Sequence, residues 1–352
     1  MILQDKKVLI TGGTGSLGKQ LVSRIITGEQ GTPAKIIVFS RDEAKQHQMR
    51  LDWKRKAVAT DEIIFRQAEE LLEFRIGDVR DFHSIQSVLN NVDIVINTAA
   101  LKQVPTCEYF PFEAVQTNID GAHNIVKAIE NNGYEVDTAV CVSTDKACKP
   151  INVMGMTKAV QERIFITGNL KCEKTRFIGV RYGNVLSSRG SVIPLFIDQI
   201  KHGRPVTITD SRMTRFLLPL NKAVDTLFFA IKEAKRGEII VSKPPSALIE
   251  DVVNVMIGDR NIEKQFMGIR PGEKIHEILI SEEECFRTID RDDHYAIQPI
   301  FPECRTSKQS ESYLEKEFSS ADNLLSTHEI KRLLEENNLL IEDQPDEKQE
   351  VL

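Results

Sequence analysis

The chain has 352 residues and a formal net charge of −6, from 46 basic and 52 acidic residues, so its overall field attracts neither nucleic acid nor an anionic membrane. Hydrophobic residues make up 41% and charged residues 28%, as in a soluble globular protein, and no apolar run approaches the length of a membrane span. The six cysteines show neither C-x-x-C pairs nor zinc-finger spacing. With no signal peptide, this pattern predicts a cytoplasmic protein with reduced thiols and no metal site.

Short apolar segments alternate with helical ones over residues 1–183. Strands are predicted at 7–11, 35–40, 74–76, 92–97, 138–143 and 176–181, and helices at 17–26, 43–72, 112–131 and 155–167. The strands lack polar–apolar alternation, which indicates a parallel sheet covered by helices on both faces. We therefore predict an α/β fold with a doubly wound parallel sheet, a Rossmann domain.

The pattern loosens after residue 183. Residues 184–215 and 246–305 contain shorter elements, and we expect them to form a smaller α/β substrate domain. Residues 216–245 hold a helix and a late strand, which should return to the Rossmann domain. Residues 306–352 form a polar tail with a last helix near 330–334, and we expect disorder after residue 341.

The first predicted strand ends in a glycine-rich turn. Gly12, Gly15 and Gly18 follow the pattern G-x-x-G-x-x-G, directly between a strand and a helix. Such a turn aims backbone N–H groups and a helix dipole at a pyrophosphate, and its last glycine lets helix and strand approach closely. We therefore predict a nicotinamide dinucleotide site whose contacts also include Thr14, Ser16 and Leu17.

Residues after the next three strands should complete this site. The second strand ends in Ser40 and Arg41, with Lys45 close behind, where an acidic residue would favour NAD. Because a guanidinium can pair with a 2′-phosphate, the sequence favours NADP, with NAD as the alternative. Further contacts are predicted at Asp78 and Val79, near the adenine edge, and at Ala99 and Ala100, where the backbone can approach the cofactor.

Three reactive side chains follow the fifth predicted strand. Thr144, Asp145 and Lys146 supply a hydroxyl, a carboxylate and an ammonium in consecutive positions. Open α/β sheets bind ligands at the carboxyl ends of their strands, so these groups should lie beside the cofactor. Met154 and Lys158 are spaced i, i+4 and share one face of the following helix.

Several motifs together carry a family resemblance over residues 5–300. The glycine turn, taken with Lys158, resembles that of extended short-chain dehydrogenases. Segments similar to the UDP-N-acetylglucosamine 4,6-dehydratases of polysaccharide biosynthesis lie at residues 100–105, 143–147, 181–185, 189–194, 207–210, 213–216 and 270–274. The chain departs from the wider superfamily at Met154, which stands where the Tyr-x-x-x-Lys motif has its tyrosine. Some of these dehydratases are similar in having methionine there.

The resemblance implies a lyase that uses NAD(P) to dehydrate UDP-N-acetylglucosamine. A hydride leaves C4 of the sugar, water is lost across C5 and C6, and the hydride returns to C6. Lys146 is then the base at C5, Asp145 the acid at the C6 oxygen, and Thr144 the hydrogen-bond donor to the C4 oxygen. Lys158 should hold the nicotinamide ribose. As a base Lys146 needs a lowered pKa; Lys158 and the positive nicotinamide ring should lower it by repulsion, Asp145 acts in the opposite direction, and the sequence leaves the balance open. The group that takes the C4 hydroxyl proton stays open, because Met154 cannot.

The same resemblance implies the remaining contacts. Arg215, Arg270 and Arg181 are expected near the diphosphate, and Glu273 on the uridine ribose. Further substrate contacts are predicted at Lys102, Asn184, Arg189, Val192, Thr207 and Thr209. Further cofactor contacts are predicted at Lys102, Asn118, Lys158, Tyr182, Asn184 and Val185. Family members commonly pair through helices such as 112–131 and 155–167, which implies a homo-oligomer.

Two other functions fit parts of this pattern. A UDP-N-acetylhexosamine 4-epimerase also begins with oxidation at C4, but it returns the hydride to C4 and needs no elimination. The adjacent Asp145 and Lys146 favour the dehydratase, because elimination requires an acid and a base. A non-catalytic NADP-binding regulator would need none of the reactive groups that this chain retains. The stereochemistry at C5 of the product stays open.

Overall fold

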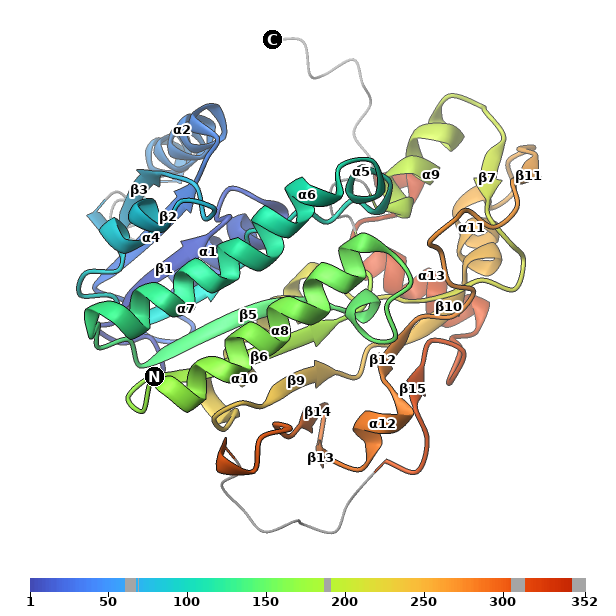
Figure 1. The fold of residues 1–352 in the computed structure, drawn as a ribbon. Helices are drawn as coiled ribbons and strands as arrows, with labels where there is room; N and C mark the ends of the chain where they lie inside the picture. The colour runs from blue at the N-terminus through green and yellow to red at the C-terminus, as the bar shows by residue number, and fades with distance from the viewer. Residues whose placement is uncertain (61–67, 69, 187–190, 305–313, 344–352) are drawn as a thin grey trace.

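A nine-stranded sheet forms the centre of the molecule (Figure 1). The computed structural model describes residues 1–60, 68, 70–186, 191–304 and 314–343. Within them the strand order is β13-β14-β9-β6-β5-β4-β1-β2-β3, and the strands from β9 to β3 run parallel. These parallel strands are β1 (Lys7–Thr11), β2 (Lys35–Ser40), β3 (Leu72–Ile76), β4 (Ile94–Asn97), β5 (Thr138–Thr144), β6 (Arg176–Tyr182) and β9 (Ile239–Ser242). The doubly wound sheet is thus confirmed, as is the return of residues 239–242 to it.

Helices cover both faces of this sheet. One face packs against α1 (Ser16–Ile26), α2 (Glu43–Thr60) and α10 (Leu220–Glu233). The other packs against α4 (Phe82–Val88), α7 (Gly121–Asn132) and α8 (Val153–Lys171), and Figure 1 shows α7 and α8 in front of the strands. Because both faces are covered, β1 is buried along nearly its whole length, and its central residues are all apolar without alternation.

The segment predicted as one long helix at 112–131 is interrupted. It is built from α6 (Pro111–Ala114), a π-helical stretch (Val115–Asp120) and then α7, and a separate short helix, α5 (Val104–Tyr109), precedes it. A π-helical turn accommodates extra residues in the helix and is frequent at functional sites. Here it buries the side chain of Asn118 completely.

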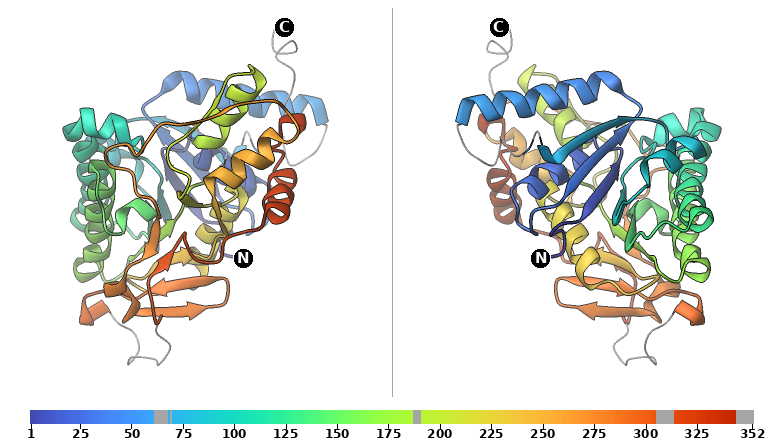
Figure 2. Two further views of the ribbon diagram at one scale, coloured as in Figure 1. Left: turned by 90° about the vertical axis from the view of Figure 1, so that its right-hand side faces the viewer. Right: turned by 90° about the vertical axis from the view of Figure 1, so that its left-hand side faces the viewer.

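A smaller lobe extends from the carboxyl edge of the main sheet (Figure 2). Its core joins α9 (Val192–Lys201), α11 (Ile249–Ile257) and α13 (Thr327–Glu336). Two strand pairs complete it: β7 (Val206–Ile208) with β11 (Lys264–Phe266), and β8 (Thr214–Phe216) with β10 (Ser246–Leu248).

Two C-terminal segments differ from the predicted division. The hairpin of β13 (Thr288–Arg291) and β14 (His294–Ile297), expected in the substrate domain, extends the main sheet because β14 pairs antiparallel with β9. Its two-residue turn contains Asp292 at φ 52°, a left-handed conformation that aspartate tolerates. A short helix, α12 (Glu282–Cys285), precedes this hairpin, and a 3-10 turn (Pro302–Cys304) follows it.

The predicted polar tail is also more ordered than expected. β15 (Phe318–Ser319) pairs with β12 (Ile278–Ile280), and α13 buries Ile330 and Leu334 against the lobe. The last helix is therefore confirmed, and a 3-10 turn (Ile341–Asp343) follows it. The rest of the region that was expected to be disordered, residues 344–352, lies outside the described residues.

Candidate active site

The predicted site residues gather where the parallel strands end. The chain order reverses between β1 and β4, so the loops after these two strands diverge and leave room for a ligand. The glycine turn follows β1, residues 98–102 follow β4, and the reactive triplet closes β5. These three segments define the candidate active site.

The glycine turn has the shape of a phosphate cradle. Gly12 has φ 67°, and a Cβ atom there would lie 2.8 Å from the backbone N and Cα of Ala99. A Cβ at Gly18 would lie 2.5 Å from the Cα of Gly13, so only glycine lets α1 pack this close to the turn. Gly15 caps α1 without a side-chain hydrogen bond, which leaves N-terminal amides of this helix for an anion.

The residues around this turn are arranged as a cofactor site requires, with one exception. Thr14 and Val79 are buried, while Ser16, Leu17, Ala99, Ala100 and Val185 are half-buried. The exception is Asn118, whose amide donates to Leu101 O (3.0 Å) and Thr157 Oγ1 (3.0 Å) and accepts from Leu101 N (2.9 Å). Since these bonds use the whole buried amide, Asn118 positions the loop that carries Lys102 and does not present a free group itself.

The adenosine end combines one buried and several exposed polar groups. The Ser40 hydroxyl is buried and accepts from Gln46 Nε2 (3.1 Å). The Arg41 guanidinium is 52% exposed and lies 3.6 Å from the Asp78 carboxylate, whereas Lys45 pairs with Asp42. Burial acts to raise the pKa of Asp78, but hydrogen bonds from Arg80 outweigh it and lower that pKa. Arg41 and Lys45 are thus both about half exposed cations at this end of the site, and each is paired with a carboxylate.

The reactive triplet forms a buried charge cluster. Thr144 Oγ1 donates to Asp145 Oδ1 (2.9 Å), and Lys146 Nζ lies 3.0 Å from the same oxygen. Lys146 Nζ also lies 3.0 Å from Glu277 Oε1, a residue that the sequence analysis did not single out. Asp145 is fully buried, Glu277 is 2% exposed, and Asp145 Oδ2 and Glu277 Oε2 have no hydrogen-bond partner among the described residues.

The electrostatics of this cluster decide a balance that the sequence left open. Burial acts to lower the pKa of Lys146, but the charges of Asp145 and Glu277 outweigh it and raise that pKa. The sequence left open whether repulsion or the pull of Asp145 prevails, and the lowered pKa that the base at C5 needs is not found in the free protein, because two carboxylates face the ammonium directly. Burial raises the pKa of Asp145, whereas the charges of Lys146 and Arg215 lower the pKa of Glu277 against its own burial.

Helix α8 places Met154 and Lys158 beside this cluster. Met154 is 4% exposed and packs with Cys107 and Ala114, so it fills space between α8 and the α5–α6 segment. Lys158 Nζ donates to Val142 O (2.5 Å) and Gln161 Oε1 (2.7 Å), and burial lowers its pKa to about 8.

The predicted substrate residues fall into two groups. Most of them lie after β6 or in the lobe: Asn184, Val192, Thr207 and Thr209 are half-buried, and Arg270 is exposed. Lys102 is also exposed but lies in the loop after β4, and burial still lowers its pKa. The Asn184 Oδ1 and Glu273 Oε2 atoms are buried without a hydrogen-bond partner among the described residues. Arg189 lies outside the described residues.

Two arginines expected near the diphosphate are held by the protein instead. Arg181 is 2% exposed and pairs with Glu162 and Glu284, each at 2.7 Å, which corrects its expected role. Arg215 donates to the carbonyls of Thr214 (2.7 Å), Lys274 (3.0 Å) and Ile275 (3.1 Å) and lies 3.7 Å from Glu277. The Arg215 guanidinium thus holds the backbone beside the reactive cluster and stabilises the Glu277 carboxylate.

Glu277 is the main site residue that sequence reasoning missed. It lies only three residues beyond the 270–274 motif, a proximity that could have drawn attention to it.

Tyr182 is buried and its hydroxyl has no hydrogen-bond partner among the described residues, as expected of a group held for a ligand.

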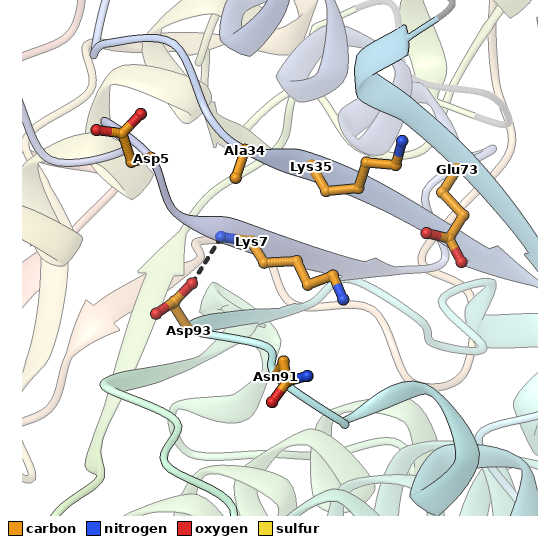
Figure 3. Close-up of a pocket in the computed structure, with 7 residues that line it drawn as sticks. All are labelled: Asp5, Lys7, Ala34, Lys35, Glu73, Asn91 and Asp93. Carbon is orange, nitrogen blue, oxygen red and sulfur yellow. Dashed lines mark hydrogen bonds between the residues drawn. The ribbon is translucent and has the colours of Figure 1, made fainter.

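Other features of the described residues do not compete with this site. A hollow of about 410 Å³ (Figure 3) opens at the amino ends of β1 and β2, the opposite edge of the sheet, and is lined by Asp5, Lys7, Ala34, Lys35, Glu73, Asn91 and Asp93. No helix in the described ranges is long and apolar enough to cross a membrane. The same ranges contain no His, Cys, Asp and Glu grouping suited to a metal ion.

Comparisons with known proteins agree with this architecture. UDP-glucose 4-epimerase of Rickettsia akari is 42% identical over 299 residues, which cover 83% of each chain. The X-ray structure of Pen from Bacillus thuringiensis shares 35% identity with a TM-score of 0.85, covering 97% of this chain and 100% of that one. The dTDP-glucose 4,6-dehydratase DesIV of Streptomyces venezuelae, solved with NAD and TYD bound, shares the fold at 18% identity, with a TM-score of 0.65 over 76% of this chain and 86% of that one. A family model described as polysaccharide biosynthesis protein matches residues 8–299, and the chain belongs to that family.

Proposed function

We propose that this chain is an NADP-dependent lyase that dehydrates UDP-N-acetylglucosamine to a UDP-4-keto-6-deoxy-N-acetylhexosamine. The observation that carries the proposal is the contact between Asp145 and Lys146, a carboxyl group and an amine 3.0 Å apart at the carboxyl end of β5. Elimination of water needs an acid at one carbon and a base at the next, and these two groups supply both.

The glycine turn fits a nicotinamide dinucleotide. The close approach of Gly12 to Ala99 and the uncapped start of α1 leave space and backbone donors for a pyrophosphate. Bound there, the nicotinamide would supply a reversible hydride acceptor for a sugar carbon. Lys158 would hold its ribose, and the exposed Arg41 would pair with a 2′-phosphate.

The preference for NADP has a direct test. Arg41→Ala should weaken NADP(H) binding while leaving NAD(H) binding nearly unchanged, because the guanidinium would contact the 2′-phosphate, which only NADP(H) carries. Isothermal titration with both cofactors measures this. Equal affinity of the unaltered protein for NADP and NAD would contradict the preference and leave the rest of the proposal standing.

The acid and the base arise from one internal proton transfer. Moving the proton of Lys146 Nζ to Asp145 Oδ1 converts the ion pair into a neutral amine and a carboxylic acid. The burial that raises the pKa of Asp145 favours this transfer. The Lys146 amine can then take the proton from C5, while Asp145 gives its proton to the departing C6 oxygen. Thr144, whose hydroxyl donates to Asp145 Oδ1 in the ion pair, is released when that oxygen takes the proton and would then donate to the C4 oxygen.

A UDP-sugar 4-epimerase is the second candidate. The Rickettsia akari relative carries that name at 42% identity, which favours it independently of the cluster geometry. An epimerase would use the same oxidation at C4 without loss of water. Asp145 and Lys146 would then have no elimination to perform.

One incubation separates the two reactions. The protein, loaded with NADP or NAD, is given UDP-N-acetylglucosamine or UDP-glucose, and the products are analysed by mass spectrometry and proton NMR. Dehydration lowers the mass by one water, whereas epimerisation leaves it unchanged. In deuterated water the dehydration product should carry deuterium at C5 and the former C4 hydrogen at C6.

The role of Lys146 is tested in the same assay. Lys146→Ala should abolish dehydration and leave cofactor affinity nearly intact, since Lys146 lies at the end of β5 and not in the glycine turn. A fully active Lys146→Ala protein, or unaltered protein that returns only the epimer, would overturn the proposed reaction.

A further inference from the structure

The Lys146 ammonium lies between two carboxylates that come from distant parts of the chain. Asp145 is its neighbour in sequence, whereas Glu277 belongs to the segment that leads into β12, and each carboxylate oxygen is 3.0 Å from Nζ. We propose that Glu277 is a positioning residue of the reactive cluster, which anchors the Lys146 nitrogen opposite Asp145 and stabilises its positive charge. This inference rests on the proposed function, and it adds Glu277 to Asp145 and Lys146 as a third ionisable group of the reactive cluster.

The position of Glu277 is fixed from a third segment. Its backbone N–H donates to Ser320 Oγ (2.9 Å), and Ser320 N–H donates to Glu277 O (2.8 Å). Ser320 is fully buried, and its hydroxyl also lies 2.7 Å from Thr214 Oγ1. With its backbone held on both sides, the buried Glu277 carboxylate has little freedom to leave Lys146.

The charges around Lys146 assign different tasks to the two acids. Arg215 Nε lies 3.7 Å from Glu277 Oε1, and Lys274 is a further cation near the same carboxylate. These cations keep Glu277 ionised, whereas Asp145 has no such arginine partner among the described residues and can hold the proton destined for the C6 oxygen. When the C5–H bond breaks and its proton reaches Lys146 Nζ, Glu277 is the carboxylate already facing the new ammonium.

The inference predicts a property of Lys146 that can be measured without turnover. Competitive labelling of the full-length protein with acetic anhydride over a pH series, read by peptide mass spectrometry, gives the pH at which Lys146 becomes reactive. The side chain is 20% exposed, so a small reagent can reach it. In Glu277→Gln the labelling midpoint should fall by about one pH unit or more, because an opposite charge in contact has been removed.

Glu238→Gln is the matched control. Glu238 is also 2% exposed and pairs with an arginine, Arg291, at 2.7 Å, but it lies at the start of β9 away from the cluster. Its substitution should leave the Lys146 midpoint where it is in the unaltered protein. A midpoint that is unchanged in folded Glu277→Gln, or that falls equally in both variants, overturns the inference.

The turnover profile gives the second readout. In Glu277→Gln the falling, alkaline limb of kcat against pH should move to lower pH with the labelling midpoint, because loss of the shared proton to solvent leaves no acid on Asp145, and the maximal kcat should fall at least tenfold. A merely structural role would lower kcat without moving the limb, and that result overturns the inference. If unaltered protein does not turn over UDP-N-acetylglucosamine, the proposed function fails, while the labelling midpoints still decide the role of Glu277.

Glu277→Asp keeps the test decisive if Glu277→Gln does not fold. This variant retains the charge but withdraws it from Lys146 Nζ by one methylene. The labelling midpoint should fall by less than in Glu277→Gln, and kcat should fall as well. No change in either quantity overturns the inference.

Discussion

Lys158 is a buried cation whose surroundings oppose its charge. It is 6% exposed, and its ammonium is held by a carbonyl and an amide oxygen without a carboxylate in contact. Burial therefore lowers its pKa from 10.5 to about 8. Such a group costs stability in the free protein and is retained where a ligand needs it.

We predict that Lys158→Met is more stable than the unaltered protein at neutral pH, by up to ~3 kcal/mol. The folded-state pKa of about 8 lies below the value of 10.5 expected for the unfolded chain. Between these values the unfolded chain binds the extra proton, so the unaltered protein gains stability as pH rises through this window. Thermal melts of both proteins from neutral to alkaline pH should show their difference shrinking, and a constant difference would contradict the pKa assignment. Cofactor affinity of the variant should fall.

Met154 contributes packing and no proton chemistry. We predict that Met154→Leu keeps most of its activity and loses less than ~1.5 kcal/mol of stability, because the volume is conserved in a site 4% exposed. Turnover and thermal unfolding measure the two effects. A folded Leu variant without activity would show that the thioether takes part in the reaction.

The contact between α8 and the reactive turn depends on one glycine. Asn152 caps α8 by accepting from Gly155 N (2.8 Å), and its amide donates to Gly272 O (2.8 Å). A Cβ atom at Gly155 would lie 2.1 Å from the carbonyl oxygen of Lys146. The helix can therefore approach the cluster only where it has no side chain.

We predict that Gly155→Ala lowers kcat at least tenfold and costs about 1–3 kcal/mol through overpacking. Gly168→Ala is the control on the same helix, because its Cβ would meet the ring of Phe177 at 3.0 Å, a side chain that can shift. Alanine favours a helix by about 1 kcal/mol over glycine, so the control should be near neutral. Equal kcat values in the two variants would contradict the proposed dependence on Gly155.

On the scale of the whole molecule, the C-terminal segment helps to build the site. Ser320 follows β15 and bonds to both Glu277 and Thr214, so residues beyond 314 stabilise the cluster at the end of β5. The other half of the same segment, α13, packs on the lobe through Ile330 and Leu334. One segment thus ties the lobe to the reactive edge of the sheet.

We predict that Ser320→Ala costs about 1–3 kcal/mol and also lowers kcat, because the buried N–H of Glu277 loses its acceptor. Ser326→Ala removes the N-cap of α13 and should cost about 1 kcal/mol with kcat unchanged. Chemical denaturation and steady-state turnover separate the two outcomes. If both variants keep full activity, the segment stabilises the fold alone.

Local patterns in the sequence determined most of the sheet and the cofactor turn. Apolar runs identified the parallel strands, and the return of residues 239–242 to the sheet was correctly predicted. The glycine spacing also indicated a feature that depends on nearby backbone, since a Cβ atom at Gly18 would collide with the backbone of Gly13 in the same turn. These features depend on residues close together in the chain or on one repeated period, so sequence alone carries them.

The tertiary structure decided what depends on distant segments. The β13–β14 hairpin joins the main sheet because β9 offers an open edge, which no local pattern encodes. Arg181 was expected at the diphosphate, but folding brings Glu162 and Glu284 around it. The pKa of Lys146 could likewise not be decided from sequence, because Glu277 reaches it across 131 positions of the chain. Electrostatic effects depend on distance in space and on burial, and both are fixed only when the chain has folded.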